Sequence, residues 1–271
     1  MGNKQGTESR SAHRPQSAGA QQSNRSSLPF SRMGNSNTVR KHVDMAAKTG
    51  ACQLTKLGLE EVPPELSSIA ANLRTLDLSE NRIGRLPATI SQFGLLKSLQ
   101  LSFNSLRNLP DEIGDLARLE TLVLTGNQLS GLPETLAKIK TLTTLTASRN
   151  QFVVFPTVVY SLRRLDVLDL SANKITSIPD GINQIQAIEM NLNQNQIAVL
   201  SEDISNCPRL KVLRLEENCL EKKMISPRLL MESQIALLTI DGNLFPAKDF
   251  PHFDGYDEYQ ERYTATKKKM G

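Results

Sequence analysis

Leucines and asparagines recur at a fixed interval through the middle of the chain. Four successive intervals of 23 residues separate the first five asparagines, and the column then drifts slightly; it comprises Asn81, Asn104, Asn127, Asn150, Asn173, Asn195, Asn218 and Asn243. The same leucines precede the first three asparagines, and an apolar residue followed by proline comes after most of them, as in Leu86-Pro87 and Phe155-Pro156. Internal repetition of this kind predicts a stacked repeat architecture.

Within each repeat, the residues before the asparagine alternate apolar and polar, which predicts a short strand. Successive repeats run in the same direction, so the strands should stack in parallel, with the asparagine side chains satisfying backbone groups at each turn. The pattern L-x-x-L-x-L-x-x-N-x-L-x-x-L-P resembles the leucine-rich repeat. It predicts an α/β fold, a curved horseshoe-shaped solenoid with a parallel concave sheet of about 8–9 strands. Cys207 falls in an apolar slot of the opposite, convex half of the core.

Four segments follow from the pattern. Residues 1–32 are polar and predict a disordered extension, because they offer too little apolar surface to offset ordering. Residues 33–50 predict a capping helix, and 51–245 the repeats, beginning with a degenerate unit in which Leu57 occupies the asparagine slot. Residues 246–271 predict a helical cap, with tyrosines on one face, and a mobile basic tail from Thr264 onward.

Charge and composition indicate which partners and which cellular compartment to expect. The net charge is +4, and residues 1–32 carry all of it, so the remainder is neutral and offers no basic face for nucleic acid. Three scattered cysteines favour a reducing compartment. With no apolar run of membrane-spanning length and no signal peptide, the expectation is a cytoplasmic monomer.

No arrangement of residues predicts catalysis. The three histidines show no ligand-like spacing, and phosphate loops, zinc-ligand clusters and nucleophile motifs are missing from the sequence. Asp77 and Asp169 fall on strands too far apart to act as a carboxylate pair. The sequence therefore predicts a protein that is not an enzyme and that needs no cofactor or metal.

The solvent positions of the concave face are the predicted partner site. Small hydroxyl residues dominate its first five strands, where they either contact a partner or simply suit a solvated strand. Exposed aromatic and arginine side chains are typical of interface hot spots. The candidate residues are Asp77, Gln100, Phe103, Val123, Arg149, Asp169, Asn191, Arg214 and Glu216.

A lipidation motif precedes the repeats. Met33-Gly34-Asn35-Ser36-Asn37-Thr38 matches M-G-x-x-x-[ST], so Gly34 is a myristoylation acceptor if translation starts at Met33. If it starts at Met1, Gly2 is the acceptor, with Gly6 where serine or threonine is wanted. One acyl chain anchors weakly, so basic residues such as Arg40 and Lys41 would have to add to it.

Residues 40–269 resemble a family of small intracellular animal proteins built of little but leucine-rich repeats. Segments outside the repeat consensus carry this resemblance, among them Asn191–Ile197, Cys207–Lys211 and Thr264–Lys269. Proteins of that family begin at M-G-N-S, which maps to Met33–Ser36. The resemblance therefore implies N-myristoylation at Gly34 and a membrane-associated form, from which residues 1–32 depart.

Two hypotheses for the function remain open. The first is a non-catalytic scaffold or adaptor that binds a protein on the concave face, optionally tethered to a membrane by the lipid. The second is a regulatory subunit of a signalling enzyme, since the Leu-Pro repeat class also resembles Ras-pathway scaffolds and so suggests small GTPase or phosphatase partners.

Overall fold

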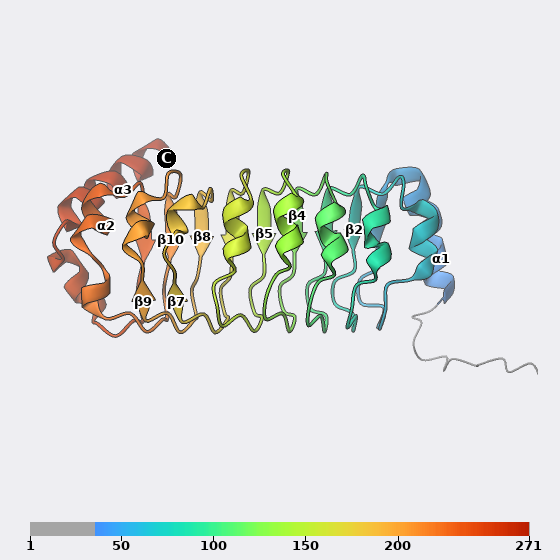
Figure 1. The fold of residues 1–271 in the computed structure, drawn as a ribbon, viewed down its shortest axis with the longest axis horizontal. Helices are drawn as coiled ribbons and strands as arrows, with labels where there is room; N and C mark the ends of the chain where they lie inside the picture. Colours follow the sequence, from blue (N-terminus) through green and yellow to red (C-terminus); the bar gives the residue numbers. More distant parts are fainter. Residues whose placement is uncertain (1–35, 271) are drawn as a thin grey trace, which may run out of the picture. The chain divides into compact units, whose positions relative to one another are not determined.

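A nine-stranded parallel sheet forms one side of the repeat array (Figure 1). The computed structural model describes residues 36–270, with side chains through Lys268; the predicted extension 1–32 and the acylation candidates Gly2 and Gly34 lie outside them. The strands of this sheet are β1 Ala51–Gln53, β2 Thr75–Asp77, β3 Ser98–Gln100, β4 Thr121–Val123, β5 Thr144–Thr146, β6 Val167–Asp169, β8 Glu189–Asn191, β10 Val212–Arg214 and β11 Leu237–Thr239.

The strand register follows the repeat. Leu76 pairs with Leu99, and Leu99 with Leu122, so the central residue of each strand stacks on its equivalent. These central residues are buried and their neighbours face outward, because side chains alternate along a strand. The nine strands confirm the predicted parallel sheet.

Short 3₁₀ helices form the opposite side of the core. Each of η1 to η5 begins directly after a proline, whose fixed φ suits the start of a helical turn. Their apolar residues, such as Ile90 and Leu136, are fully buried against the sheet. The 3₁₀ helices are η1 Pro64–Ile69, η2 Ala88–Gln92, η3 Asp111–Asp115, η4 Glu134–Lys138, η5 Thr157–Ser161, η6 Ile182–Gln184, η7 Glu202–Asn206, η8 Lys222–Met224 and η9 Ala247–His252.

The core between these two sides includes two of the cysteines. Cys207 lies in the convex half, as predicted, and is 2% exposed. Burial raises the pKa of its thiol to about 12 and that of Cys52 to about 11. Both thiols are therefore protonated core residues rather than nucleophiles.

An asparagine holds the turn after every strand of the nine-stranded sheet except β1. Asn127 is representative: its Oδ1 accepts from the Leu106 N–H at 3.0 Å, and its Nδ2 donates to the carbonyl oxygens of Leu101 and Leu124 at 2.9 and 3.0 Å. One of those carbonyls belongs to the same repeat and the other to the preceding one. The predicted asparagine ladder is confirmed, and in the first repeat Leu57 stands in its place, with its own N–H bonded to Asn81 Oδ1.

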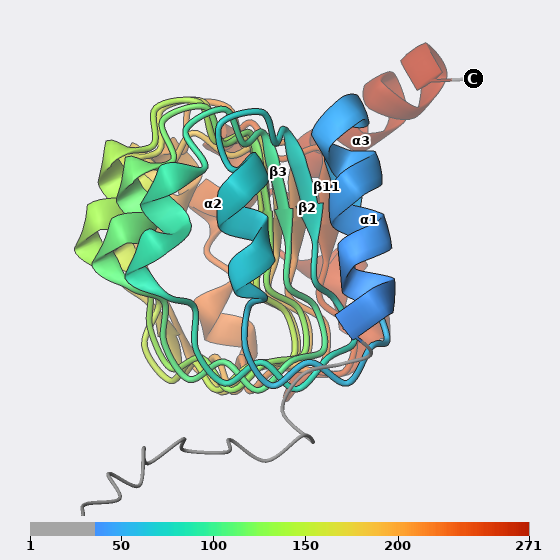
Figure 2. The ribbon, with the colours of Figure 1, turned by 90° about the vertical axis from the view of Figure 1, so that its right-hand side faces the viewer.

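Helices cover both ends of the sheet (Figure 1), and Figure 2 shows α1 lying across the N-terminal end. At the start, α1 Ser36–Thr49 buries Val39, Val43 and Ala46. At the C-terminal end, α3 Tyr256–Met270 places Tyr259 against the last strand. The Tyr259 hydroxyl accepts from the Leu238 N–H and donates to the Leu238 carbonyl. An open sheet edge invites pairing with another chain, and these caps prevent it.

The C-terminal region differs from the sequence expectation in two ways. Helix α3 does not end near Tyr263 but continues to Met270, so the segment expected to be a mobile tail is helical. A helix that was not expected, α2 Pro227–Glu232, begins with a proline behind the capping serine Ser226. Arg262 of α3 donates to the carbonyl oxygens of Leu230 and Met231, at the end of α2, and so joins the two helices.

A second, two-stranded sheet runs along the edge of the array where the strands end. It pairs β7 Ser177–Ile178 in parallel with β9 Val199–Leu200. These residues lie between the asparagine turn and the next 3₁₀ helix. Along this edge, the backbones of two neighbouring repeats therefore run parallel and are hydrogen-bonded to each other (Figure 1).

Candidate functional site on the sheet face

The outward side of the nine-stranded sheet, called the sheet face here, is the surface that the sequence predicts to be concave. Its exposed positions are the first and third residues of each strand and the residue two places further on. Of the predicted site residues, Gln100, Val123, Asp169, Asn191, Arg214 and Glu216 are half-buried at such positions. The structure thus places these six on one continuous surface.

Asp77 occupies an equivalent register position but is not an exposed candidate. The residue is only 9% exposed, and its Oδ1 accepts from the Ser79 N–H at 2.9 Å. Asp169 makes the same bond to Ser171, and Asn191 makes it to Asn193. For Asp77 the expectation of a solvent-facing contact residue was wrong, since the carboxylate serves its own strand end.

A second column borders the sheet face, one residue before each asparagine. Seven non-glycine residues there have φ between +53° and +59°, in the left-handed region that side chains rarely adopt. The members are Lys56, Glu80, Phe103, Gly126, Arg149, Ala172, Gln194, Glu217 and Gly242. We call this set the left-handed column. Its backbone conformation is shared, whereas its side chains differ at almost every repeat.

Phe103 is held on the surface by a glycine in the next repeat. A Cβ atom at Gly126 would lie 2.6 Å from Phe103 Cδ1, so the ring rests where a side chain would otherwise stand. The ring nevertheless stays 49% exposed. Phe103 is therefore a fixed, partly supported aromatic surface rather than a mobile one.

Arg149 stands one repeat beyond that glycine. Its backbone N–H is bonded to the Ser171 carbonyl at 2.9 Å, which fixes the left-handed turn from which the side chain extends. The side chain is exposed, and among residues 36–270 no carboxylate lies within ion-pairing distance of its guanidinium. Phe103 and Arg149 thus form an aromatic and a cationic group separated only by the Gly126 repeat.

In the C-terminal third of the sheet face, charged and amide side chains are joined by hydrogen bonds and an ion pair. Asn193 donates to Glu216 Oε2 and accepts from the Glu216 N–H, while Gln194 donates to Glu217 Oε2 at 3.0 Å. Arg214 forms an ion pair with Glu189 on the neighbouring strand. The sequence did not reveal these pairings, because each joins residues about one repeat apart whose side chains must reach across the sheet.

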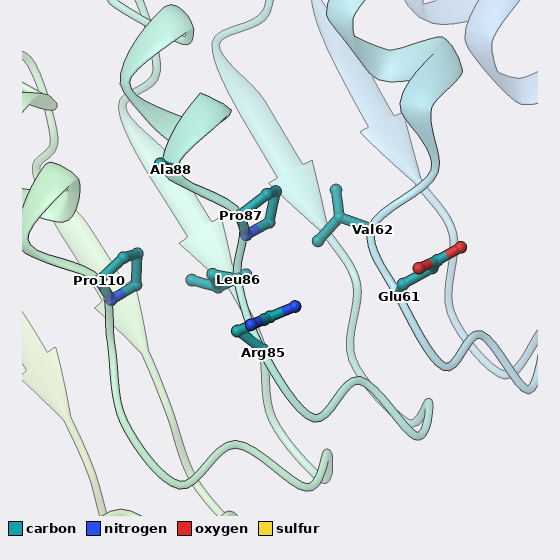
Figure 3. Close-up of a pocket in the computed structure, with 7 residues that line it drawn as sticks. All are labelled: Glu61, Val62, Arg85, Leu86, Pro87, Ala88 and Pro110. Carbon is teal, nitrogen blue, oxygen red and sulfur yellow. The ribbon is translucent and has the colours of Figure 1, made fainter.

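The described residues offer no cluster of metal ligands and no membrane-spanning helix. No group of three or more histidine, cysteine, aspartate or glutamate side chains within residues 36–270 could hold a metal ion. No helix in the described part of the chain is long and apolar enough to cross a membrane. A depression of about 430 Å³ lies off the sheet face and is lined by residues of the first three repeats, among them Glu61, Arg85 and Pro110 (Figure 3).

These features define a class: a solenoid of parallel strands and 3₁₀ helices, closed by two helical caps, with an open sheet face of varied side chains. Family models for the leucine-rich repeat match residues 72–93, 94–152 and 164–185. The chain therefore contains leucine-rich repeats, and domains built of such repeats generally mediate contacts between proteins.

Solved structures support the same fold. A leucine-rich repeat protein from Leptospira interrogans is 22% identical, with 80% of this chain and 73% of that chain covered and a TM-score of 0.50. A plant ice-binding protein is 23% identical, with 73% and 67% covered and a TM-score of 0.56. The leucine-rich repeat ectodomain of the Arabidopsis thaliana receptor kinase GASSHO1/SCHENGEN3 is 30% identical over 68% of this chain and 23% of that chain, with a TM-score of 0.54.

Proposed function

We propose that the chain is a non-catalytic scaffold or adaptor that binds a protein partner on the sheet face, with Phe103 and Arg149 at the centre of the contact. The observation that carries the proposal is the pair itself. A ring supported by Gly126 and an arginine without a carboxylate partner project from a rigid backbone. Aromatic and arginine side chains held in place before binding lose little entropy when a partner arrives.

One comparison supports this use of the fold. The Arabidopsis ectodomain was solved in complex with CASPARIAN STRIP INTEGRITY FACTOR 2, so a related repeat array does take up a partner. Gln100 and Val123 flank the proposed centre, and Arg214 and Glu216 supply charged groups toward its C-terminal side. The partner would therefore lie across several strands rather than in a single pocket.

The test compares two variants in affinity purification from cells. Phe103→Ala/Arg149→Ala should lose the partners that the unaltered chain retains, with binding at least about tenfold weaker, because two hot-spot side chains are removed. Arg163→Ala/Arg164→Ala, which removes exposed residues off the sheet face, should retain those partners. An unchanged partner set in the first variant would refute the assignment. Recovery of a stoichiometric GTPase or phosphatase would instead favour the regulatory-subunit alternative.

A lipid anchor at Gly34 is a second part of the proposal. It rests on the M-G-x-x-x-[ST] match and on the resemblance of residues 40–269 to leucine-rich repeat-containing protein 57, and it implies a cytoplasmic protein with a membrane-associated form. Mass spectrometry of the N-terminal peptide from cells should show a myristoylated glycine. An unacylated terminus at Met1 in all molecules would exclude the anchor.

A further inference from the structure

The edge where the strands end carries charge of one sign only over six successive repeats. We call these segments the turn edge; they are residues 82–86, 105–109, 128–132, 151–155, 174–178 and 196–200. They contain four cations and no carboxylate: the cations are Arg82, Arg85, Arg107 and Lys174. All four side chains are exposed. Because the folded repeats as a whole are close to neutral, this one-sided edge is a local feature.

The opposite edge has a different pattern. Its segments lead from each 3₁₀ helix into the next strand and carry both signs, and their charges are often paired. Lys97 binds Glu120 at 2.7 Å, and Asp166 binds Arg209 at 2.8 Å. Among the described residues, the one side-chain partner of Arg107 on the turn edge is the neutral Gln128, with Nε 3.4 Å from Oε1, so no described carboxylate compensates its charge.

Exposed apolar side chains occupy the C-terminal half of the same turn edge. Val154 is 73% exposed, Val199 54% and Val153 50%. Val153 and Val154 lie two repeats away from Val199, and the repeat between them is bonded to both: the Thr176 N–H bonds to the Val153 carbonyl, and β7 pairs Ser177 with Val199. Large apolar side chains that protrude together from a surface generally mark an interaction site.

The first helix begins at this edge. Only Gly50 separates the end of α1 from β1, so α1 runs opposite to the strands and its N-terminal end lies toward the side where the strands end (Figures 1 and 2). Arg40 and Lys41, in the first half of α1, are exposed. Two further cations therefore lie toward the same side of the molecule.

We propose that the turn edge lies on an anionic membrane surface, with the four cations against lipid headgroups and the three valines inserted at the level of the headgroups. Cations near an anionic leaflet and a few inserted apolar side chains are the two contributions that hold peripheral proteins on membranes. The basic stretch begins after Glu60 and Glu61 and ends before Glu221, which defines its length. This orientation leaves the sheet face free, so one chain can hold a partner and a membrane together.

The test uses the full chain without acylation and vesicles of phosphatidylcholine with or without phosphatidylserine. The chain should sediment with the phosphatidylserine vesicles, less so at high salt, and not with phosphatidylcholine alone. Arg82→Gln/Arg85→Gln/Arg107→Gln/Lys174→Gln should weaken that binding by about tenfold to several hundredfold, because each cation contributes up to roughly a factor of five. Val154→Ser/Val199→Ser keeps the charge and should also weaken it about tenfold.

The matched control removes four exposed cations from the opposite edge: Arg118→Gln/Lys140→Gln/Arg163→Gln/Arg164→Gln. It has the same net charge as the turn-edge variant and keeps residues 1–32, so it should bind almost as the unaltered chain does. Equal losses in the two charge variants, or no binding to phosphatidylserine vesicles, would overturn the proposal. Retained vesicle binding with loss of a cellular protein from the turn-edge variant would also overturn it and assign the edge to a protein partner. Circular dichroism confirms that each variant is folded.

The vesicle-binding result can be told apart from the test of the proposed function. Phe103→Ala/Arg149→Ala should bind vesicles normally, whereas the turn-edge variant should retain sheet-face partners. The protein is unacylated in this assay, so failure to find a lipid on Gly34 leaves the prediction intact. A failed sedimentation experiment likewise leaves the sheet-face assignment unaffected.

Discussion

Two columns of residues that are adjacent in the chain differ in how strictly the fold determines the residue type. The asparagine column uses one residue in eight repeats, and each asparagine from Asn81 to Asn218 is less than 10% exposed. The left-handed column, one residue earlier, has a phenylalanine, an arginine, glutamates, glycines and others in the same backbone conformation.

The difference comes from what each side chain must satisfy. An asparagine supplies an acceptor and two donors to backbone groups that have no water available, so no other residue substitutes well. A left-handed residue extends its side chain over the surface, where it contacts at most the same position of a neighbouring repeat, as Phe103 does at Gly126 and Gln194 does at Glu217. The asparagine column is therefore fixed by the fold, while the column one residue earlier accepts many side chains.

Asn127→Leu should be the most damaging change. It leaves the Leu106 N–H and the Leu101 and Leu124 carbonyls without their partner, and the free energy of unfolding should fall by about 3 kcal/mol. Urea unfolding followed by circular dichroism measures the loss. Asn243→Leu, at the half-buried end of the ladder, should lose about 1 kcal/mol. Equal losses at the two sites would contradict the idea that burial makes the asparagine essential.

Gly126→Ala should come next. The added Cβ meets the Phe103 ring and the residue has φ +70°, so the free energy of unfolding should fall by roughly 1–2 kcal/mol. Combining it with Phe103→Ala removes the clash but not the backbone strain, and should restore about 0.5–1 kcal/mol. A double-mutant cycle in urea gives this coupling. A coupling near zero would show that the ring does not depend on the glycine.

The sequence predicts most of this frame because the repeat makes every position a copy of others. The nine strands, the buried leucines, the asparagine ladder and the burial of Cys207 all follow from the 23-residue spacing. The sheet-face positions follow too, since alternation along a strand assigns them. Phe103 and Arg149 were identified as departures from the consensus, which requires only the register.

What the sequence does not predict depends on single side-chain choices. Asp77 turns toward Ser79 instead of solvent, and either direction suits a strand. The β7–β9 pair involves two residues per strand, too few for alternation to show. Helix α3 continues past Tyr263 because residues such as Ala265 and Lys267 favour helix without burying an apolar face. The position of Phe103 over Gly126 depends on a rotamer and on a contact between repeats.

Ala172→Gly should have the smallest effect and the opposite sign. Alanine at φ +53° carries backbone strain of roughly 1–2 kcal/mol, which glycine removes, while glycine's greater freedom in the unfolded chain takes back roughly 0.5–1 kcal/mol. The free energy of unfolding should therefore rise by about 0.5 kcal/mol. Ala198→Gly, an exposed alanine outside the left-handed set, should instead lower it by roughly 0.5–1 kcal/mol. If both variants lose stability, neighbouring groups relieve the strain at Ala172, and the column is then constrained by more than its backbone conformation.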